Sequence, residues 1–470
     1  MSAEDGEARR LARWVEANVG GVVTGIERLP RWRPAWHIDV DLGDRTLALH
    51  ARGEREALMA MPFWIADERR VHDLLEAHGI PVPHVFGYCD DPYAMVMDRL
   101  SGNVDLTFAS SDDERAAIRL EYLQLLPRIH GIDLGDVEAA GFRIPANAEE
   151  VALNLFSAFE EAYDERIAAP DPVSEFLRCW LHRNYPRHRD TPRFLTYDAF
   201  QFMFDEGRIT GLIDFELATV GDPQAELAAL RIRDTIKNVG DLPAIAAIWE
   251  QVTGDVVDPD VITYHSIAYN AQTVLGTVPA IVRPTPEGDL MSYLGWYVNS
   301  ARWALEDIAD LMEFRLDPVS APEPTPSRYR HVDDLLVSCL AKRGPQLALD
   351  DYERAKLFRV ARHLQRIREL GPAIDDASLD DAEALIGVRP TIEELDAALV
   401  GFIRTAGAEH DEAIVRLLNR RLTWQQLTLG PEGSNMLRHP RLPGFFESRG
   451  GEGDAVDDQR WTPGLIPGTR

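Results

Sequence analysis

Residues 202–223 read FMFDEGRITGLIDFELATVGDP, and this stretch decides the fold class. Two short apolar runs, 202–205 and 209–213, flank a Glu-Gly pair, which is the pattern of a β-hairpin with a tight turn. Asp214 directly follows the second run. A carboxylate in that position either lies rigidly at the edge of a cleft or caps the next turn, and the stretch alone is compatible with both interpretations.

Outward from the hairpin, the chain changes from β-rich to helical. Residues 8–19 have the apolar spacing of an amphipathic helix, and residues 66–78 predict a second one. Around the second helix, period-two and β-branched patterns predict strands in GVVTGIERL, AWHIDVDLG, RTLALHARG, VPHVFGYCDDP and YAMVMDRL. From residue 110 onward the periodicity is mainly helical. The sequence therefore predicts a compact α+β lobe followed by a helical lobe that contains the hairpin.

Composition and charge narrow the class of partner. The chain has 470 residues, a formal net charge of -29 and three cysteines, which form no CxxC pair. An acidic surface repels phosphate backbones and anionic lipid, so we expect neither nucleic acid nor membrane as a partner. The same acidity attracts cationic small molecules and equally keeps a protein soluble. A polar N-terminus, scattered cysteines and the lack of a long apolar run predict a soluble, cytoplasmic protein.

The hairpin stretch resembles the aminoglycoside-phosphotransferase and choline-kinase-like family, which has a protein-kinase-like fold. In that family the hairpin ends in Ile-Asp-Trp/Phe-Glu, followed by Gly-Asp-Pro and a helix that opens with an acidic residue, Leu and Ala. Residues 213–216, 221–223 and 226–228 match this pattern. The resemblance implies an ATP-dependent kinase in which Asp214 binds Mg²⁺, a cation that prefers hard oxygen ligands and bridges ATP phosphates.

The first lobe carries the same resemblance. Arg52 ends the strand TLALHA, and Glu68 lies on the following helix, as in the family's basic residue and helix Glu that hold the ATP phosphates. The alternative is that Arg52 and Glu68 form a solvated ion pair, which would contribute little to the stability of the fold. His50 competes with Arg52 for the phosphate role, and we prefer Arg52. The stretch YAMVMDRLSG resembles the strand that leads into the interlobe hinge, which implies that backbone near Met97 contacts adenine.

Two stretches depart from the family. Its catalytic loop reads His-Gly-Asp, four residues, then Asn, whereas residues 194–204 read FLTYDAFQFMF. Gln201 occupies the Asn position and becomes a metal ligand by resemblance. An ungapped alignment places Thr196 at the position of the catalytic Asp, whereas a shortened loop places Asp198 there. We favour Asp198 as the base that accepts the proton of the acceptor hydroxyl.

The turn between the first two strands also differs. The family has a glycine-rich turn whose amides cradle phosphate, but LPRWRPAW (29–36) contains no glycine and two prolines. Arg31 and Arg33 could instead hold phosphate through charge-assisted hydrogen bonds, hold another anionic partner, or form a solvated basic loop.

These residues predict an ATP- and Mg²⁺-dependent phosphotransferase that acts on a hydroxyl group of a small molecule. The alternative is a catalytically inactive, kinase-like binding or regulatory module, which the altered catalytic loop and the missing glycine-rich turn would suit. A metal-dependent hydrolase built on Asp214, Glu216 and Asp222 is a third interpretation, which we consider weaker because these positions do not obviously converge.

The organisation along the chain follows from the same patterns. A proline-rich stretch separates the two lobes from a further helical region, and a Gly-, Asp- and Pro-rich tail is expected to be disordered. We expect a nucleotide-binding lobe at 1–102, a helical lobe with the catalytic hairpin at 103–316, a linker at 317–327, a helical region at 328–447 and the tail at 448–470.

Overall fold

The computed structural model of the chain describes residues 3–31, 33–54, 59–167, 169–286, 288–325, 330–342, 348–430 and 441–443. The tail predicted at 448–470 lies outside the described residues, as does part of the predicted region 328–447. Within the described parts of the chain, no helix combines the length and the apolar character needed to cross a bilayer.

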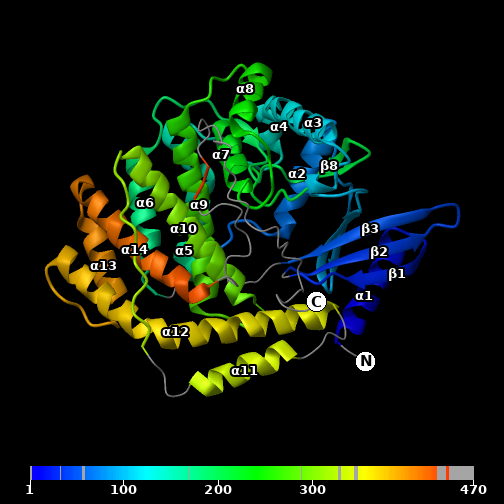
Figure 1. Ribbon diagram of the computed structural model, residues 1–470. Helices are drawn as coiled ribbons and strands as arrows, with labels where there is room; N and C mark the ends of the chain where they lie inside the picture. The colour runs from blue at the N-terminus through cyan, green and yellow to red at the C-terminus, as the bar shows by residue number, and fades with distance from the viewer. Residues whose placement is uncertain are drawn as a thin grey trace.

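The N-terminal lobe is an antiparallel sheet in the order β1-β2-β3-β5-β4 (Figure 1). Its elements are α1 (Ala3–Asn18), β1 (Val22–Arg28), β2 (Ala35–Asp41), β3 (Thr46–Gly53), α2 (Ile65–Ala77), β4 (Val85–Asp90) and β5 (Tyr93–Asp98). The period of two along β5 sorts its side chains to opposite faces. Val96 joins the cluster of Leu11 and Val15 from α1, whereas Met97 joins the cluster of Ile65 from α2. The two helices therefore cover opposite faces of the sheet.

The second lobe is helical around two small strand pairs. The predicted hairpin is present as β7 (Phe202–Asp205) and β8 (Arg208–Leu212), and a further pair joins β6 (Arg193–Leu195) to β9 (Thr219–Gly221). The helices are α3 (Asp112–His130), α4 (Leu134–Ala139), α5 (Ala148–Arg166), α6 (Pro172–Asn184), α7 (Gln224–Arg233), α8 (Leu242–Thr253), α9 (Pro259–Val282) and α10 (Leu290–Leu311). The bilobal α+β prediction is confirmed.

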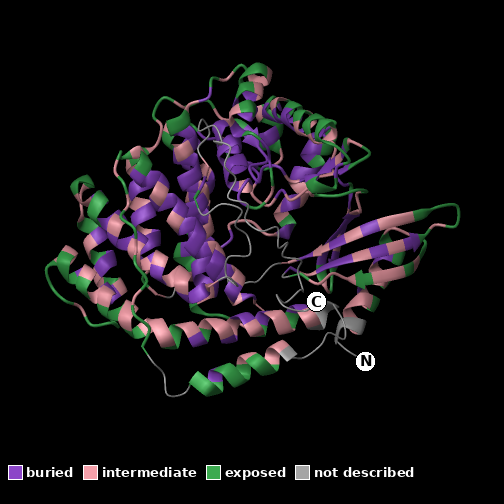
Figure 2. Cartoon of the chain, in the orientation of Figure 1, coloured by how far each residue is buried: buried purple, intermediate pink, exposed green. Residues whose placement is uncertain are grey.

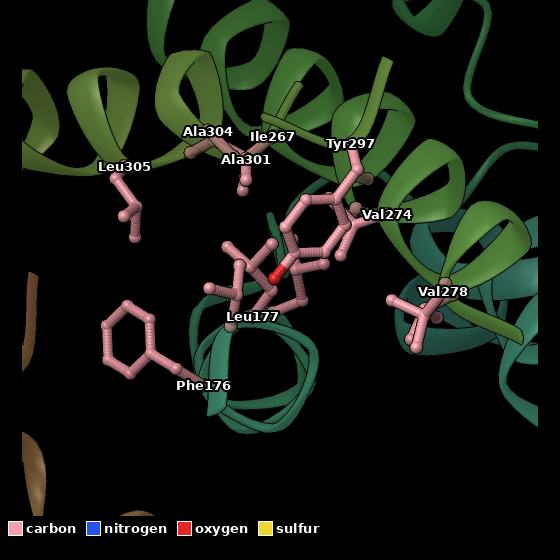
Figure 3. Packing of buried hydrophobic residues seen from close by; sticks show 14 of the residues in the cluster. Phe176, Leu177, Ile267, Val274, Val278, Tyr297, Ala301, Ala304 and Leu305 are labelled. Atoms are coloured by element: carbon pink, nitrogen blue, oxygen red, sulfur yellow. The ribbon is translucent and has the colours of Figure 1, made fainter. Parts of the chain in front are cut away.

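One large apolar cluster fixes the long helices of the second lobe. Phe176 and Leu177 on α6 belong to it together with Val274 on α9 and Ala301 on α10 (Figure 3). Tyr297 lies in the same cluster, and its hydroxyl donates to Asp171 Oδ1 at 2.8 Å, so its polar end is satisfied. Close packing of this kind holds α9 and α10 rigid, and these helices also form a wall of the site described below.

The added C-terminal helices share this core. They are α11 (Arg330–Lys342), α12 (Ala348–Ile386), α13 (Leu395–Thr405) and α14 (Asp411–Leu429). Buried residues such as Ala382, Leu399 and Leu418 belong to the same cluster as α6, α9 and α10. Helix α11 lies against α12 on the outside of the molecule and is largely exposed (Figures 1 and 2).

Candidate active site

The loop before the hairpin and the residue after it have strained backbones. Tyr197, Phe200 and Asp214 adopt φ values of 62°, 63° and 68°, in the left-handed region that most residues avoid. Buried Glu226 holds the loop, because its Oε1 accepts from the backbone N–H of Thr196 at 2.8 Å and of Tyr197 at 3.0 Å. Strain of this kind concentrates at functional sites, where the surrounding structure enforces it.

Arg52 connects the N-terminal lobe to the residues that follow the hairpin. Its Nη1 donates to Glu68 Oε2 at 3.2 Å, and its Nη2 donates to Glu216 Oε2 at 2.9 Å and to Asp214. Oxygens of Glu68, Asp214 and Glu216 all lie within 4.8 Å of one another. The predicted Arg52–Glu68 pair is therefore part of a larger cluster that joins both lobes, and it is not a solvated surface pair.

Arg33 is a structural member of the same cluster. Its side chain is 1% exposed, its Nη1 donates to Glu216 at 2.6 Å, and its Nε donates to the Gly53 carbonyl at 2.8 Å. Because these groups occupy the guanidinium, Arg33 is not the solvated loop residue that one interpretation allowed. Arg31 faces the cavities described below.

Charges in the cluster decide between two basic candidates. Burial alone would raise the pKa of Asp214, but the guanidinium groups of Arg52 and Arg33 lower it well below its ordinary value, so the carboxylate is ionised. Burial, together with smaller contributions from nearby His37 and Arg31, lowers the pKa of His50 to about 3, so its imidazole is uncharged near neutral pH. Of His50 and Arg52, therefore, only Arg52 carries a positive charge that could attract an anionic ligand.

Gln201 lies between two carboxylates. Its Nε2 donates to Asp198 Oδ2 at 2.9 Å and to Asp214 Oδ2 at 3.1 Å. Its Oε1 accepts from Lys237 Nζ at 3.4 Å. Five of the predicted site residues, Arg52, Glu68, Asp198, Gln201 and Asp214, thus form one continuous chain of contacts.

The two candidates for the family's catalytic Asp point in different directions. The Thr196 hydroxyl donates to buried Glu226 at 3.0 Å, away from the cleft. Asp198 lies at the cleft, where its Oδ1 accepts from Tyr269 at 3.0 Å and from Arg233, while its Oδ2 accepts from Gln201. A carboxylate has about four acceptor positions, so one on Oδ2 is left for a further donor.

Two cavities meet at these residues. The first, here called the sheet-side cavity, has a volume of about 560 Å³ and lies between β2, β3, the end of β5 and the hairpin; His50, Arg52, Met97 and Lys237 are in its wall. The second, the helix-side cavity, has a volume of about 300 Å³ and lies between α5, α7, α9 and α10. Arg31, Gln201 and Asp214 line both cavities, whereas Asp198 lines only the helix-side one.

Met97 lies in the wall of the sheet-side cavity, next to the predicted hinge. The two backbone N–H groups that follow it are engaged, because Asp98 N donates to the His84 carbonyl and Arg99 N to the Ala48 carbonyl, each at 3.0 Å. A contact between Met97 and a nucleotide base therefore cannot rely on those two donors as they stand.

Sequence reasoning missed Lys237, which follows α7 and borders the sheet-side cavity. Its Nζ donates to the Val104 carbonyl at 3.3 Å and contacts Gln201. Burial and the neighbouring Arg233 lower the pKa of Lys237 to about 8. Composition could have pointed to Lys237, because the sequence contains only three lysines and Lys237 is the only one before residue 342.

The donor set fits a hard divalent cation. Carboxylate oxygens of Glu68, Asp214 and Glu216 lie close together, and oxygen ligands are what Mg²⁺ requires. Arg52 occupies these carboxylates in the present arrangement, and an amide ligand from Gln201 requires its Oε1 to turn away from Lys237.

Comparison with known proteins finds a family match. Residues 29–255 match the family described as the phosphotransferase enzyme family. Acyl-CoA dehydrogenase family member 11 of Homo sapiens is 26% identical over 184 residues, which cover 37% of this chain and 23% of the relative. Family member 10 of Mus musculus is 26% identical over 234 residues, which cover 46% of this chain and 21% of the relative. The chain spans less than a quarter of the length of these relatives.

Among solved structures, the GDP complex of aminoglycoside 2'-phosphotransferase-IIIa is similar with a TM-score of 0.45 and 15% identity. The match covers 65% of this chain and 99% of that chain.

Proposed function

With residues 29–255 belonging to the phosphotransferase enzyme family, we propose that the protein transfers the γ-phosphoryl group of ATP to a hydroxyl group of a small molecule, with Mg²⁺ as its cofactor. One observation carries the proposal. Two cavities meet at Asp214 and Gln201, with the cation Arg52 on one side and the carboxylate Asp198 on the other. A phosphoryl donor and an acceptor need this arrangement, because transfer requires two ligands in line across a shared charged centre.

The sheet-side cavity is the proposed nucleotide site. Arg31, Arg52, Arg99 and Lys237 border it in a chain whose formal net charge is -29. A local excess of cations in an acidic protein favours an anionic ligand such as a triphosphate. Arg52, fixed by Glu68, would bind the phosphates, and Met97 would contact the base. Mg²⁺ held by Asp214 and Gln201 would supply charge neutralisation on the phosphates.

Asp198 is the proposed base. The acceptor hydroxyl would donate its proton to the remaining position on Oδ2 while its oxygen forms a bond to the γ-phosphorus and the bond from that phosphorus to the β–γ bridging oxygen breaks. Arg233 and Tyr269 hold the other oxygen and so fix the carboxylate in one orientation. The chain contributes position and charge, which are the principal demands of phosphoryl transfer.

The alternative proposal, an inactive binding module, has one observation in its favour. Both oxygens of Asp214 and both oxygens of Asp198 already accept from protein donors. If these contacts persist with nucleotide bound, the protein binds ATP without transferring phosphate.

The proposal places the protein in a reducing, cytoplasmic compartment with a small molecule as its partner. Cys89, Cys179 and Cys339 are free thiols, which suits such a compartment. The net charge of -29 disfavours a nucleic-acid partner.

Ligand-linked stabilisation tests the proposal. Thermal unfolding of the full chain is followed with ATP, with and without Mg²⁺, in wild type, Asp214→Asn and Asp205→Asn. A ligand that binds only the folded state at 100 times its Kd stabilises it by about 2.7 kcal/mol. We expect a Mg²⁺-dependent rise in Tm for wild type and for Asp205→Asn, since Asp205 is exposed at the far end of β7, and its loss in Asp214→Asn.

The outcomes separate the candidates. No rise in wild type at millimolar ATP would rule out the kinase. A Mg²⁺-dependent rise without ADP release in the presence of any alcohol would favour the inactive module.

A further inference from the structure

The wall of the helix-side cavity changes in character with distance from Asp214. Its charged groups are Asp198, Asp214 and Glu216 together with Arg31 and Arg233. The carboxylates accept from arginines, Asp198 from Arg233 and the other two from Arg52, so they form one neutralised network. Among the described residues of the remaining wall there is no acidic side chain. Large apolar groups border it instead, namely Met59, Met61, Phe159, Trp296 and Trp303.

This wall does not suit a polycation. Each ammonium group that leaves water needs an anionic partner, and a buried charge without one is costly. The three carboxylates available here are already paired. The volume of about 300 Å³ lies at the lower end of the roughly 300–1,000 Å³ that small-molecule sites occupy. Both features favour a compact ligand with an apolar body and no net positive charge.

A buried acceptor atom adds a directional requirement. Gln272 on α9 lines the cavity and is 4% exposed. Its Nε2 donates to the Tyr197 hydroxyl at 3.2 Å, and its Oε1 has no hydrogen-bond partner in the described parts of the chain. A buried amide oxygen without a donor costs about 1–3 kcal/mol, which a ligand donor would recover. Asn299 and Ser300 on α10 line the same cavity and can take part in neutral hydrogen bonding.

We propose that the helix-side cavity binds a small, uncharged alcohol with an aromatic or alicyclic body. The body lies against Trp296 and Trp303, the reactive hydroxyl reaches Asp198 Oδ2, and a second donor of the ligand reaches Gln272 Oε1. As the phosphoryl acceptor, this alcohol rests on the proposed function: its oxygen gains the γ-phosphoryl group, ADP leaves, and its proton passes to Asp198. Binding of the alcohol itself needs no nucleotide.

Binding to the full chain without nucleotide tests this inference by isothermal titration calorimetry. The probes are three neutral alcohols, tyrosol, 2-phenylethanol and cyclohexylmethanol, and two cationic ones, choline and kanamycin. We expect the neutral alcohols to bind about tenfold tighter than the cations, a difference of about 1.4 kcal/mol. Tyrosol carries a second hydroxyl donor that can reach Gln272 Oε1, so we expect it to bind wild type tighter than 2-phenylethanol does. This difference in affinity should shrink in Gln272→Met, which removes the acceptor.

A variant that adds a negative charge to the wall should shift the preference from neutral to cationic ligands. Asn299→Asp keeps the shape of the wall and adds a carboxylate without a cation, so choline should bind tighter and 2-phenylethanol weaker than in wild type. Asn18→Asp, at an exposed position near the end of α1, is the matched control and should change neither. Circular dichroism of each variant verifies that it is folded.

The outcomes distinguish this inference from the proposed function. Neutral alcohols that bind no tighter than choline and kanamycin overturn the ligand class, whatever ATP does. If the alcohols bind but Mg²⁺-ATP gives no thermal shift, the phosphotransferase fails and the neutral-alcohol site stands. If Mg²⁺-ATP binds and kanamycin is the preferred acceptor, the phosphotransferase stands and the ligand class is wrong.

Discussion

The two cavities that meet at Asp214 differ in the side chains that border them. The sheet-side cavity has a basic wall, with Arg31, Arg52, Arg99 and Lys237. The helix-side cavity has an aromatic and methionine-rich wall beyond one neutralised network of charges. Sheet strands position single polar residues at their ends, whereas packed helices present broad apolar faces. Under the proposed function, the sheet side would hold the phosphates and the helix side would select the acceptor.

The difference also bears on what an acidic protein attracts. A formal net charge of -29 invites the expectation of a cationic ligand. The described cavities give no support to it, because one is basic and the acidic residues of the other are paired with Arg52 and Arg233. The residues that line each cavity, rather than the net charge of the chain, therefore determine which ligand charge the cavity suits. The net charge acts on solubility and long-range steering.

The largest expected effect comes from replacing the proposed base. Asp198→Asn keeps the side-chain shape but cannot accept a proton, so kcat should fall by about 10²–10⁴. Mg²⁺-ATP binding should stay unchanged, because Asp198 does not line the sheet-side cavity. Steady-state ADP release with the best alcohol and thermal shift with ATP measure the two quantities.

Thr196→Val is the matched comparison for that experiment. It removes a hydroxyl that donates to Glu226 and faces away from the cleft. We expect a small loss of stability and little change in kcat. A large loss of kcat in Thr196→Val with a normal rate in Asp198→Asn would restore the ungapped alignment and remove Asp198 from the mechanism.

Most of the features around the sheet-side cavity were predictable from the sequence. The period-two runs predicted the strands. The strand end alone left Asp214 open between a cleft position and a turn cap, and the resemblance of the Ile-Asp-Phe-Glu run to the family's hairpin was what made it a candidate site residue. The direction of Arg33 was not predictable. A turn has no periodicity, so sequence cannot tell a guanidinium that faces solvent from one that is buried against Glu216.

The helix side was less predictable for a physical reason. Trp296, Asn299 and Trp303 follow helical spacing, and such a stripe is equally consistent with a packed core and with a cavity wall. Only the placement of α10 relative to α9 and α5 decides which residues of the stripe line the cavity. The short pair β6 and β9 was missed as well, because three-residue strands are too short for a period-two pattern to appear.

The second effect tests whether the sheet side is held together by charge. Arg52 is 13% exposed and contacts three carboxylates. Arg52→Met leaves these anions close together in a poorly hydrated place, so the free energy of unfolding should fall by about 3–5 kcal/mol. Urea denaturation measures it. Added Mg²⁺ or Ca²⁺ should recover part of the loss, because the oxygens that remain suit a hard cation.

Arg99→Met is the matched control in the same lobe. Arg99 is 30% exposed and pairs with a half-exposed Asp39, so the expected cost is at most about 1 kcal/mol. Equal losses in the two variants would mean that the buried cluster contributes no more than a surface pair, and the contrast between the two cavities would then have no energetic basis.

The smallest effect uses the one lysine on the sheet side. Because the pKa of Lys237 is lowered to about 8 from 10.5, the unfolded chain binds more protons than the folded chain between these values, and this lysine makes stability rise with pH across that window. A bound triphosphate favours the charged form. The affinity for ATP should therefore fall as pH rises above about 8, by roughly tenfold for the loss of a charged hydrogen bond.

His50 and His72, with pKa values of about 3 and about 4, stay neutral throughout the window. Isothermal titration from pH 7.5 to about 9.5 measures the slope, and Lys237→Met should abolish it. A wild-type affinity that is flat over this range, or a slope that survives in Lys237→Met, would show that Lys237 does not contact the phosphates and would leave Arg31, Arg52 and Arg99 as the cations of the basic wall.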